Sequence, residues 1–275
     1  MDVRATTGLG DINMIEQQGG LAGKIFIVTG GTQGLGEETA MALAGASADG
    51  IVICGRNQDN GNRVQAALEA AGTEADFVRA DLAEVEDCRR VIAACDERFG
   101  RIDGLVNAAG ITDRGTIDDT SVELWDRMFA VNARAPFLLM QGVIRIMKRD
   151  GNGGAIVNVI TMSSHGGQPK LTAYSASKGA LATLTKNIAH AVRFDGIRVN
   201  GLNIGWADTA NEHTIQRAEG QPDDWLARAE AEQPFGRLIK PADVARFCLF
   251  LLGPESGVMT GSVIDCDQMV MGAYD

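Results

Sequence analysis

"KIFIVTGGTQGLGEETAMALAG", residues 24–45, decides the fold of this 275-residue chain. It begins with an apolar, β-branched run, which predicts a buried strand. A glycine-rich turn follows, and the residues after it have a helical pattern. Gly30, Gly34 and Gly36 are spaced as G-x-x-x-G-x-G, so the backbone can turn tightly and approach a ligand closely. We therefore expect a strand, a glycine turn and a helix, in that order.

The glycine turn predicts nucleotide binding. A helix that starts directly after such a turn can bind a pyrophosphate, because its backbone N–H groups and the positive end of its dipole face the ligand. The spacing differs from the G-x-G-x-x-G of the larger dehydrogenases, and the turn lacks the Lys-Ser/Thr pair of a P-loop. A purely structural turn is the alternative, which the position between a first strand and a first helix makes the weaker interpretation.

Short apolar runs alternate with longer helical patterns along the rest of the chain. Strands are predicted at 24–30, 50–56, 75–81, 104–110, 155–161, 198–205 and 262–267. Helices are predicted at 34–45, 60–71, 84–99, 121–129, 132–149, 174–194 and 241–252. Apolar strands separated by helices indicate a parallel sheet covered on both faces. No linker interrupts the pattern, so we expect a polar N-terminal arm over 1–22 and a single dinucleotide-binding and catalytic domain over 23–275.

Composition excludes several classes of partner. The formal net charge of −11 argues against binding nucleic acid or anionic lipid, although a helix N-terminus can still bind a small anion. No apolar run reaches the length of a membrane span, and the N-terminus lacks the pattern of a secretory signal. No CxxC pair occurs, and the histidines are scattered, so we expect no metal site and a cytoplasmic protein with reduced cysteines, at positions 54, 88, 95, 248 and 266.

"AYSASKGA", residues 173–180, places Tyr174 and Lys178 on one face of a predicted helix, because residues four apart are neighbours there. A phenol has a pKa of about 10, and a neighbouring ammonium lowers this pKa. We therefore expect a tyrosine that exchanges a proton with an alcohol or carbonyl oxygen. The small residues between the two leave room for a cofactor. Taken alone, the pair also fits an amphipathic surface helix.

The residue at the end of the predicted second strand predicts the cofactor. An acid at this position binds the ribose 2′-hydroxyl of NAD, whereas a cation accepts the 2′-phosphate of NADP. The chain has Arg56 here and no acid, which favours NADP(H), with NAD(H) as the alternative. Two observations weaken this interpretation. Arg56 would also suit a solvated surface, and Gln33 stands in the glycine turn where a second cation would support NADP.

Four motifs occur in a fixed order: "TGGTQGLG" (29–36), "NAAG" (107–110), "VNARAPF" (131–137) and "YSASK" (174–178). With the strand and helix order, they resemble the short-chain dehydrogenase/reductase family over about residues 22–270. The resemblance implies a Rossmann-type, doubly wound parallel sheet of about seven strands. It also implies that the protein binds a nicotinamide cofactor and moves a hydride between its C4 atom and a carbonyl or alcohol carbon.

The resemblance implies four catalytic residues. Tyr174 matches the family's proton donor and acceptor, and Lys178 matches the lysine that tunes the tyrosine pKa and bonds to the nicotinamide ribose. Asn132 matches the asparagine that helps to hold a proton-relay water. The family's polarising serine is replaced here by Thr161, which can donate the same hydrogen bond through a bulkier side chain. Ser163 is the alternative for this role.

The resemblance also implies a cofactor-binding set: Gly30, Thr32, Gln33, Gly34, Leu35, Gly36, Arg56, Asp81, Leu82, Asn107, Ala108, Gly110, Tyr174, Lys178, Ile204, Gly205 and Thr209. Asp81 matches the acid that contacts the adenine amino group, and Asn107 matches a turn beside the adenine ribose. Their alternatives are helix capping and turn formation. Ile204 replaces the family's proline, and "DCDQ" replaces Asp-Gly-Gly near the C-terminus; we expect cofactor binding to survive both changes.

Residues 206–237, here called the substrate loop, occupy the family's variable substrate-binding segment. Ser163, His165 and Trp206 are the candidate substrate contacts, although His165 also suits a structural or rim position and Trp206 also suits packing. The loop has no basic cluster, which disfavours a bulky polyanionic substrate such as an acyl carrier protein. We expect a small polar secondary alcohol or its ketone, polyol- or sugar-like, by analogy with the family.

The resemblance implies a homotetramer whose seam is formed by residues 132–149 and 174–194. The runs "CLFLL" and "MVMGAYD" are candidates for a second interface, or for interior packing. Two other function classes stay open from the sequence. One is a non-catalytic nucleotide-binding or regulatory protein on the same fold, and the other is an epimerase-type enzyme. The catalytic residues argue against the first, and the single glycine motif argues against the second.

Overall fold

A seven-stranded, fully parallel sheet forms the centre of the molecule. The structure is a computed structural model that describes residues 20–272, so most of the predicted N-terminal arm lies outside the described residues. The strand order is β3-β2-β1-β4-β5-β6-β7. The strands are β1 (Ile25–Thr29), β2 (Gly50–Gly55), β3 (Glu74–Arg79), β4 (Gly104–Asn107), β5 (Gly154–Val159), β6 (Ile197–Ile204) and β7 (Val263–Cys266). The prediction of a doubly wound parallel sheet is confirmed.

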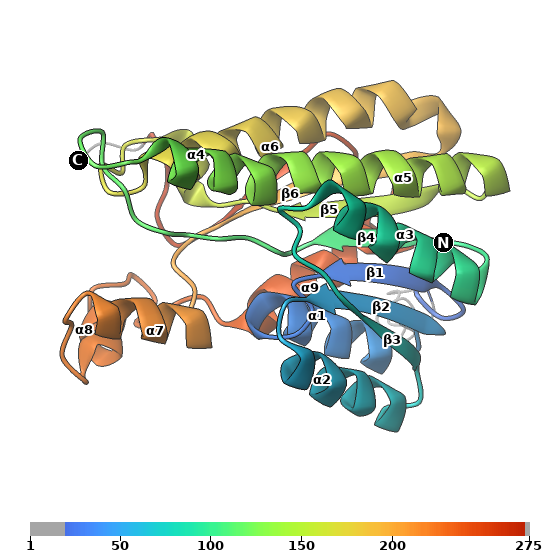
Figure 1. Cartoon of the computed structure of the whole chain (residues 1–275), viewed down its shortest axis with the longest axis horizontal. Coiled ribbons are helices and arrows are strands. Elements are labelled where there is room, and N and C mark those ends of the chain that lie inside the picture. The colour runs from blue at the N-terminus through green and yellow to red at the C-terminus, as the bar shows by residue number, and fades with distance from the viewer. Residues whose placement is uncertain (1–19, 273–275) are drawn as a thin grey trace, which may run out of the picture.

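Helices cover both faces of the sheet (Figure 1). One layer contains α3 (Val85–Phe99), α4 (Val122–Phe129), α5 (Ala135–Asp150) and α6 (Thr172–Val192). The other layer contains α1 (Gly34–Gly45), α2 (Gln58–Ala70) and α9 (Pro241–Leu252). Two short helices, α7 (Ala210–Ala218) and α8 (Trp225–Ala231), form a lobe that projects beyond the layers.

The side chains of β1 explain why both faces need helices. Ile25 and Ile27 pack into the core under α3, α5 and α6, whereas Phe26 and Val28 pack into the core under α1, α2 and α9. Successive side chains of a strand point to opposite faces, so a strand that is apolar throughout is stable only between two layers. All five β1 residues are buried. The apolar run that opens the glycine motif is thus buried between the two helical layers, and β1 lies between β2 and β4 in the sheet.

The predicted strands overrun at their carboxyl ends. β4 ends at Asn107 rather than at residue 110, and β5 ends at Val159 rather than at residue 161. At these points the chain leaves the sheet, and β1 and β4 lie side by side although their helices cover opposite faces. Such a switch point opens a crevice beyond the strand ends. Residues 108–110 and Ile160, which were predicted to continue β4 and β5, therefore line a cleft instead.

A π-helical turn, Ala130–Arg134, joins α4 to α5 where the sequence predicts two separate helices. The turn buries Asn132 and interrupts the regular hydrogen-bond ladder without ending the helix. Such π-turns occur often at functional sites. This turn brings the "VNARAPF" motif against the loop after β4.

The substrate loop contains more regular structure than the sequence predicts. It forms α7 and α8 around a small apolar core of Trp225, Ala229 and Leu238. Within residues 20–272, none of the helices combines the length and apolarity that crossing a membrane requires. Over the same range, no three acidic, histidine or cysteine side chains are grouped so that they could hold a metal ion.

Candidate active site

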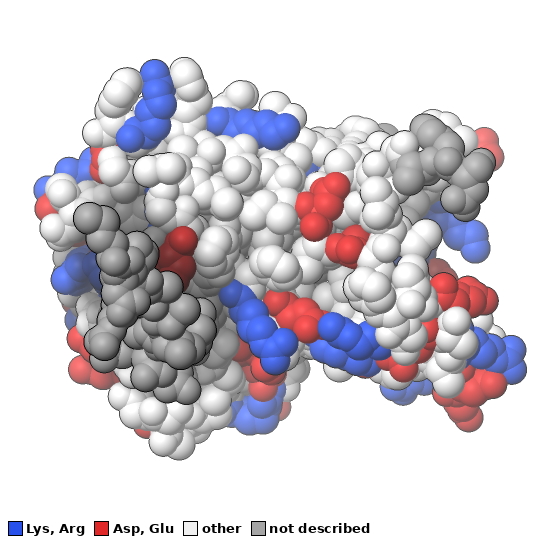
Figure 2. All heavy atoms as spheres, turned by 180° about the vertical axis from the view of Figure 1, so that it is seen from behind, with Lys and Arg blue, Asp and Glu red and all other residues white. Residues whose placement is uncertain are grey.

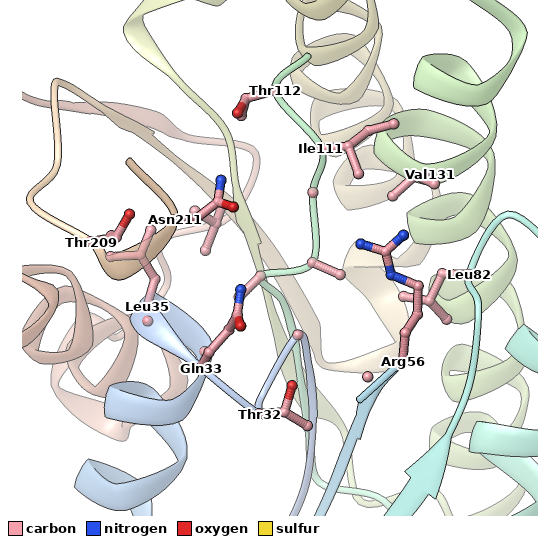
Figure 3. A pocket seen from close by; sticks show the side chains of 18 of the residues that line it. Thr32, Gln33, Leu35, Arg56, Leu82, Ile111, Thr112, Val131, Thr209 and Asn211 are labelled. Atoms are coloured by element: carbon pink, nitrogen blue, oxygen red, sulfur yellow. The ribbon is translucent and has the colours of Figure 1, made fainter. Parts of the chain in front are cut away.

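The main cleft lies beyond the carboxyl ends of β1, β2, β3 and β4 and has a volume of about 780 Å³. It is lined by fifteen of the predicted residues: Gly30, Thr32, Gln33, Gly34, Leu35, Gly36, Arg56, Asp81, Leu82, Ala108, Gly110, Tyr174, Lys178, Ile204 and Thr209. Figure 3 shows Gln33 in the middle of this cleft, between Thr209, the N-cap residue of α7, and Arg56, which directly follows β2. The structure therefore gathers residues from across the whole chain at one edge of the sheet.

The glycine turn forms the floor of the cleft. Gly30 and Gly34 have positive φ angles of +65° and +57°, a conformation that L side chains rarely adopt. A Cβ atom on Gly36 would lie 2.4 Å from the Gly30 carbonyl oxygen, so the first turn of α1 can pack this closely only with glycine. Gln33 caps α1 in an extended conformation, and its side chain makes no capping hydrogen bond. The first N–H groups of α1 are thus suited to bind an anion.

Arg56 and Asp81 lie at the opposite end of the cleft from α7. Figure 3 shows the Arg56 side chain extending from β2 toward Val131. The Asp81 carboxylate accepts a hydrogen bond from the Ala83 backbone (3.0 Å) and lies 3.4 Å from the Arg127 guanidinium. Asp81 therefore forms a local turn while it lines the cleft, and Glu84 rather than Asp81 caps the next helix, α3. Arg127 also lines the cleft but was not predicted, because the sequence around it contains no recognisable motif.

Tyr174 and Lys178 both reach the cleft from α6, four residues apart. The Lys178 side chain is 4% exposed, and its Nζ donates a hydrogen bond to the Val159 carbonyl at 2.8 Å. Burial lowers the pKa of Lys178 from 10.5 to about 8, because a low-dielectric site disfavours the charged form. The prediction that these two side chains share one site is supported by this geometry.

The predicted direction of the Tyr174 pKa shift is wrong for this structure. Burial raises the pKa of Tyr174 to about 12, and the Glu212 carboxylate adds to the increase. The hydrogen bond with Thr161 and the charge of Arg114 oppose it. The Lys178 ammonium, which the sequence predicted would lower this pKa, is not among the groups that act on it. Desolvation of the phenolate therefore outweighs the charges near it.

Thr161, rather than Ser163, is the hydroxyl whose interaction lowers the pKa of Tyr174. The Thr161 Oγ1 also accepts a hydrogen bond from the Ser163 backbone at 3.2 Å, which fixes the start of a 3₁₀ turn, Met162–His165. The Ser163 hydroxyl donates to Gln168 Oε1 at 2.7 Å, and neither Ser163 nor Thr161 is among the residues that line the cleft. The geometry thus supports the choice of Thr161 over its alternative.

Two predicted asparagines lie behind the cleft wall rather than on it. The Asn132 side chain accepts from the Ile111 backbone (3.0 Å) and donates to the Ile111 carbonyl and to Ser177 Oγ (2.9 and 3.1 Å). It therefore ties the loop after β4 to α6. The Asn107 amide donates to Asn158 Oδ1 at 2.8 Å within the sheet, away from the cleft lining. Both residues position the wall.

The predicted substrate contacts also lie outside the main cleft lining. His165 Nε2 lies 3.1 Å from both Asp265 Oδ1 and Asn203 Nδ2, which supports its structural alternative. Trp206 stacks on Trp225 with ring centroids 6.0 Å apart. This arrangement favours packing over closure on a substrate.

Gly205 is placed beside the C-terminal departure from the family pattern. A Cβ on Gly205 would lie 2.1 Å from the Asp267 carboxylate, so this glycine makes room for a neighbouring side chain and does not line the cleft. Its neighbour Ile204 does line the cleft.

The sequence analysis missed half of the residues that line the cleft. Most of them lie in the last residues of a strand or in the loop that follows it, and the others lie in α4, the π-helical turn or α7. They are Cys54, Gly55, Asn57, Ala80, Ala109, Ile111, Thr112, Asp113, Arg127, Val131, Val159, Ile160, Ala210, Asn211 and Ile215. The last residues of each predicted strand, taken together with the loop that follows, would have included most of them, because the carboxyl edge of a parallel sheet is where such sites form.

The cleft fits a nicotinamide dinucleotide. Its volume lies in the range of small-molecule sites, about 300–1,000 Å³. The first turn of α1 and its glycines would hold the pyrophosphate, and the end of β2 with the Asp81 loop would hold the adenosine. Tyr174 and Lys178 would then lie at the nicotinamide end, near Ile204 and Thr209.

Comparison with known proteins agrees with this geometry. A family model described as enoyl-(acyl carrier protein) reductase matches residues 30–268. A 2,5-dichloro-2,5-cyclohexadiene-1,4-diol dehydrogenase of Sphingobium indicum is 33% identical over 90% of this chain and 96% of the relative. An NADP-dependent (R)-specific alcohol dehydrogenase of Lentilactobacillus kefiri is 32% identical over 92% of this chain and 97% of the relative.

A crystal structure of an actinorhodin polyketide ketoreductase variant with NADPH superposes with a TM-score of 0.85, at 28% identity, covering 90% of this chain and 96% of the ketoreductase. The sheet order, the cleft and the matched family model all lead to one assignment. The chain belongs to the short-chain dehydrogenase/reductase family.

Proposed function

We propose that this NAD(P)-dependent oxidoreductase transfers a hydride between its cofactor and a small secondary alcohol or ketone, with Tyr174 as the proton donor and acceptor. The observation that carries the proposal is the placement of Tyr174 and Lys178 together at one end of the dinucleotide-sized cleft. The family's acid–base pair requires this placement. A polyol- or sugar-like substrate stays the finer prediction.

The side chains of this site can be assigned separate tasks. The bound nicotinamide supplies or accepts the hydride. Tyr174 gives its phenolic proton to the carbonyl oxygen during reduction and removes the alcohol proton during oxidation. Thr161 orients the phenol through its hydrogen bond. Lys178 uses one Nζ donor on the Val159 carbonyl, and its other donors would bond to the nicotinamide ribose.

The names of the relatives support secondary alcohols as the substrate class. One relative acts on a cyclohexadiene diol, and another is an (R)-specific alcohol dehydrogenase. A first panel should therefore contain acyclic and six-membered-ring secondary alcohols, polyols and their ketones. Turnover is followed through the absorbance of the reduced nicotinamide with each cofactor.

Replacement of Tyr174 by Phe tests the proposal. We expect Tyr174→Phe to lower kcat by at least about 100-fold, because general acid–base catalysis contributes about 10²–10⁴-fold. Cofactor affinity, measured by fluorescence titration, should stay within a few-fold of wild type. Activity close to that of wild type would contradict the assignment of the proton donor.

NADP(H) is the preferred cofactor in this proposal. Arg56 lines the cleft at the end of β2, where the 2′-phosphate of NADP would lie, and a relative is named as NADP-dependent. Arg56→Ala should weaken NADPH binding by about tenfold or more and leave NADH binding nearly unchanged. Equal losses for both cofactors would show that Arg56 does not read the 2′-phosphate.

We also propose a cytoplasmic homotetramer. Three phenylalanine side chains are 38–40% exposed: Phe137 on α5, and Phe247 and Phe250 on α9. These two helices therefore offer apolar surface that a neighbouring subunit could cover. Covering such surfaces is a common reason for assembly. The mass in solution, measured by light scattering, tests this proposal.

A further inference from the structure

Arg114 joins the loop after β4 to α7 across the substrate end of the cleft. Its Nε donates a hydrogen bond to Glu219 Oε1 at 3.1 Å, and its Nη2 lies 3.7 Å from Glu212 Oε1. We call these three residues the latch. A second cavity, of about 350 Å³, lies along it and is lined by residues of both walls, including Arg114, Lys170 and Glu219.

The latch lies beside the catalytic phenol. Gly115 pairs with Leu171, and the Gly115 carbonyl accepts a hydrogen bond from the Thr172 backbone at 3.1 Å. The residue after Arg114 is therefore bonded to the first turn of α6, which carries Tyr174. The charges of Arg114 and Glu212 also act on the pKa of Tyr174, so a substrate whose oxygen reaches Tyr174 is exposed to the charges of the latch.

The charge of Arg114 is already compensated. Glu212 accepts hydrogen bonds from Trp206 Nε1 and Gln216 Nε2 at 2.9 and 2.7 Å, and its side chain is only 14% exposed, so this carboxylate is held in place. The charged residues that line the two cavities at this end, together with Glu212 of the latch, are three cations and four carboxylates: Arg114, Lys170, Lys178, Asp113, Asp119, Glu212 and Glu219. The substrate end is therefore net negative.

The surrounding lobe has the same character. The substrate loop holds seven Asp and Glu residues against three Arg. Figure 2 shows acidic side chains crowded on the lobe at the lower right, with a few basic side chains between them. An approaching anion meets a negative potential before it reaches the latch.

We propose that the latch restricts this enzyme to substrates without a negative charge near the reacting carbon. The inference rests on the proposed function and narrows its substrate class to neutral alcohols and ketones. A carboxylate-bearing substrate would have to take Arg114 from Glu219 and leave that glutamate unpaired beside Glu212. Like charges placed together in this way disfavour binding.

The test is direct binding of two ligands of matched shape, cyclohexanecarboxamide and cyclohexanecarboxylate, to the full chain saturated with NADP⁺. We expect the carboxamide to bind at least about tenfold more tightly by calorimetry, because only the carboxylate meets like charges. The difference should shrink at high salt, which screens charge but leaves shape recognition unchanged.

Variants separate the latch from the overall charge of the lobe. Glu219→Gln should lower the preference for the carboxamide several-fold, because it frees Arg114 for the ligand, and adding Arg114→Gln should abolish that gain. Glu232→Gln removes the same charge from an exposed site on the loop and should leave the preference as in wild type.

The outcomes distinguish this inference from the proposed function. Equal affinities in wild type, tighter binding of the carboxylate, or binding of neither ligand would overturn the inference. So would an equal effect of Glu219→Gln and Glu232→Gln. Loss of the proposed function would instead appear as no turnover of any neutral alcohol or ketone by a chain that binds NADP(H) normally.

Discussion

At the scale of single residues, Lys178 shows how burial changes the meaning of a sequence motif. The spacing of Tyr174 and Lys178 correctly places both side chains at one site. The spacing does not predict how deeply the two side chains are buried. Burial raises the pKa of the tyrosine to about 12 and lowers that of the lysine to about 8. A charged Lys178 at neutral pH therefore lowers the stability of the folded protein. We infer that the lysine is nevertheless present because the proposed activity needs it.

This cost leads to a pH prediction. The folded pKa of Lys178 is about 8, below its unfolded value of 10.5, so the unfolded chain binds more protons between these values and stability rises with pH there. Relative to Lys178→Met, the wild-type free energy of unfolding should increase by about 1 kcal/mol between pH 7 and pH 9.

Chemical denaturation of both proteins across this range measures the difference. Taking the difference removes the contribution of the buried thiols, whose pKa values are raised and whose effect has the opposite sign. A difference that does not change with pH would contradict the shift assigned to Lys178.

At the scale of elements, the start of α1 depends on glycine for reasons of space. Gly36, in the first turn of α1, lies so close to Gly30 that a methyl group added to Gly36 would collide with the Gly30 carbonyl oxygen. Backbone atoms cannot move aside as a flexible side chain can. The turn and the helix therefore form one unit, in which binding and folding depend on the same contacts.

Gly36→Ala should lower both stability and cofactor affinity. The new Cβ would lie 2.4 Å from the Gly30 carbonyl oxygen, so we expect a loss of about 1–3 kcal/mol in the free energy of unfolding and at least about tenfold weaker NADPH binding.

Gly45→Ala is the matched control in the same helix. Its Cβ would meet no atom within 4 Å, and alanine favours the helix, so stability should stay equal or rise by up to about 1 kcal/mol. Similar losses in the two variants would show that close approach is not the reason for Gly36.

At the scale of the whole molecule, the chemistry and one main structural anchor lie at opposite edges of the sheet. Asp103, which is 9% exposed, precedes β4 at the edge away from the cleft. Its carboxylate accepts a hydrogen bond from the Ile25 backbone at 2.9 Å, and its carbonyl accepts one from the Ala155 backbone at 3.0 Å. It also pairs with Arg101 and Lys24. One residue thus connects β1, β4 and β5.

Asp103→Ala should lower the free energy of unfolding by about 1–3 kcal/mol, because it leaves a buried N–H without its charged partner. The Michaelis constants should be unchanged at temperatures where the protein stays folded, since the cleft is at the other edge. Asp103→Asn keeps an oxygen acceptor and should recover part of the loss. A large change in cofactor affinity would show that the two edges are coupled.

The sequence by itself determined the alternation of strands and helices, the burial of β1 between two layers and half of the cleft lining. These features follow from local rules: an apolar run needs two covering layers, and a glycine turn after a strand needs no distant partner. The resemblance to the family also indicated Tyr174, Lys178 and Thr161 as candidate catalytic residues from the sequence alone.

Only the tertiary structure decided which predicted residues face the cleft. Asn132 and Asn107 turn into the wall, where Asn132 bonds to the Ile111 backbone and the Asn107 amide nitrogen donates to Asn158. It also decided the direction of the Tyr174 pKa shift, which depends on burial by distant segments, and it brought Arg114 to Glu212 and Glu219. Residues about a hundred positions apart have no local pattern that joins them, so only folding creates their interaction.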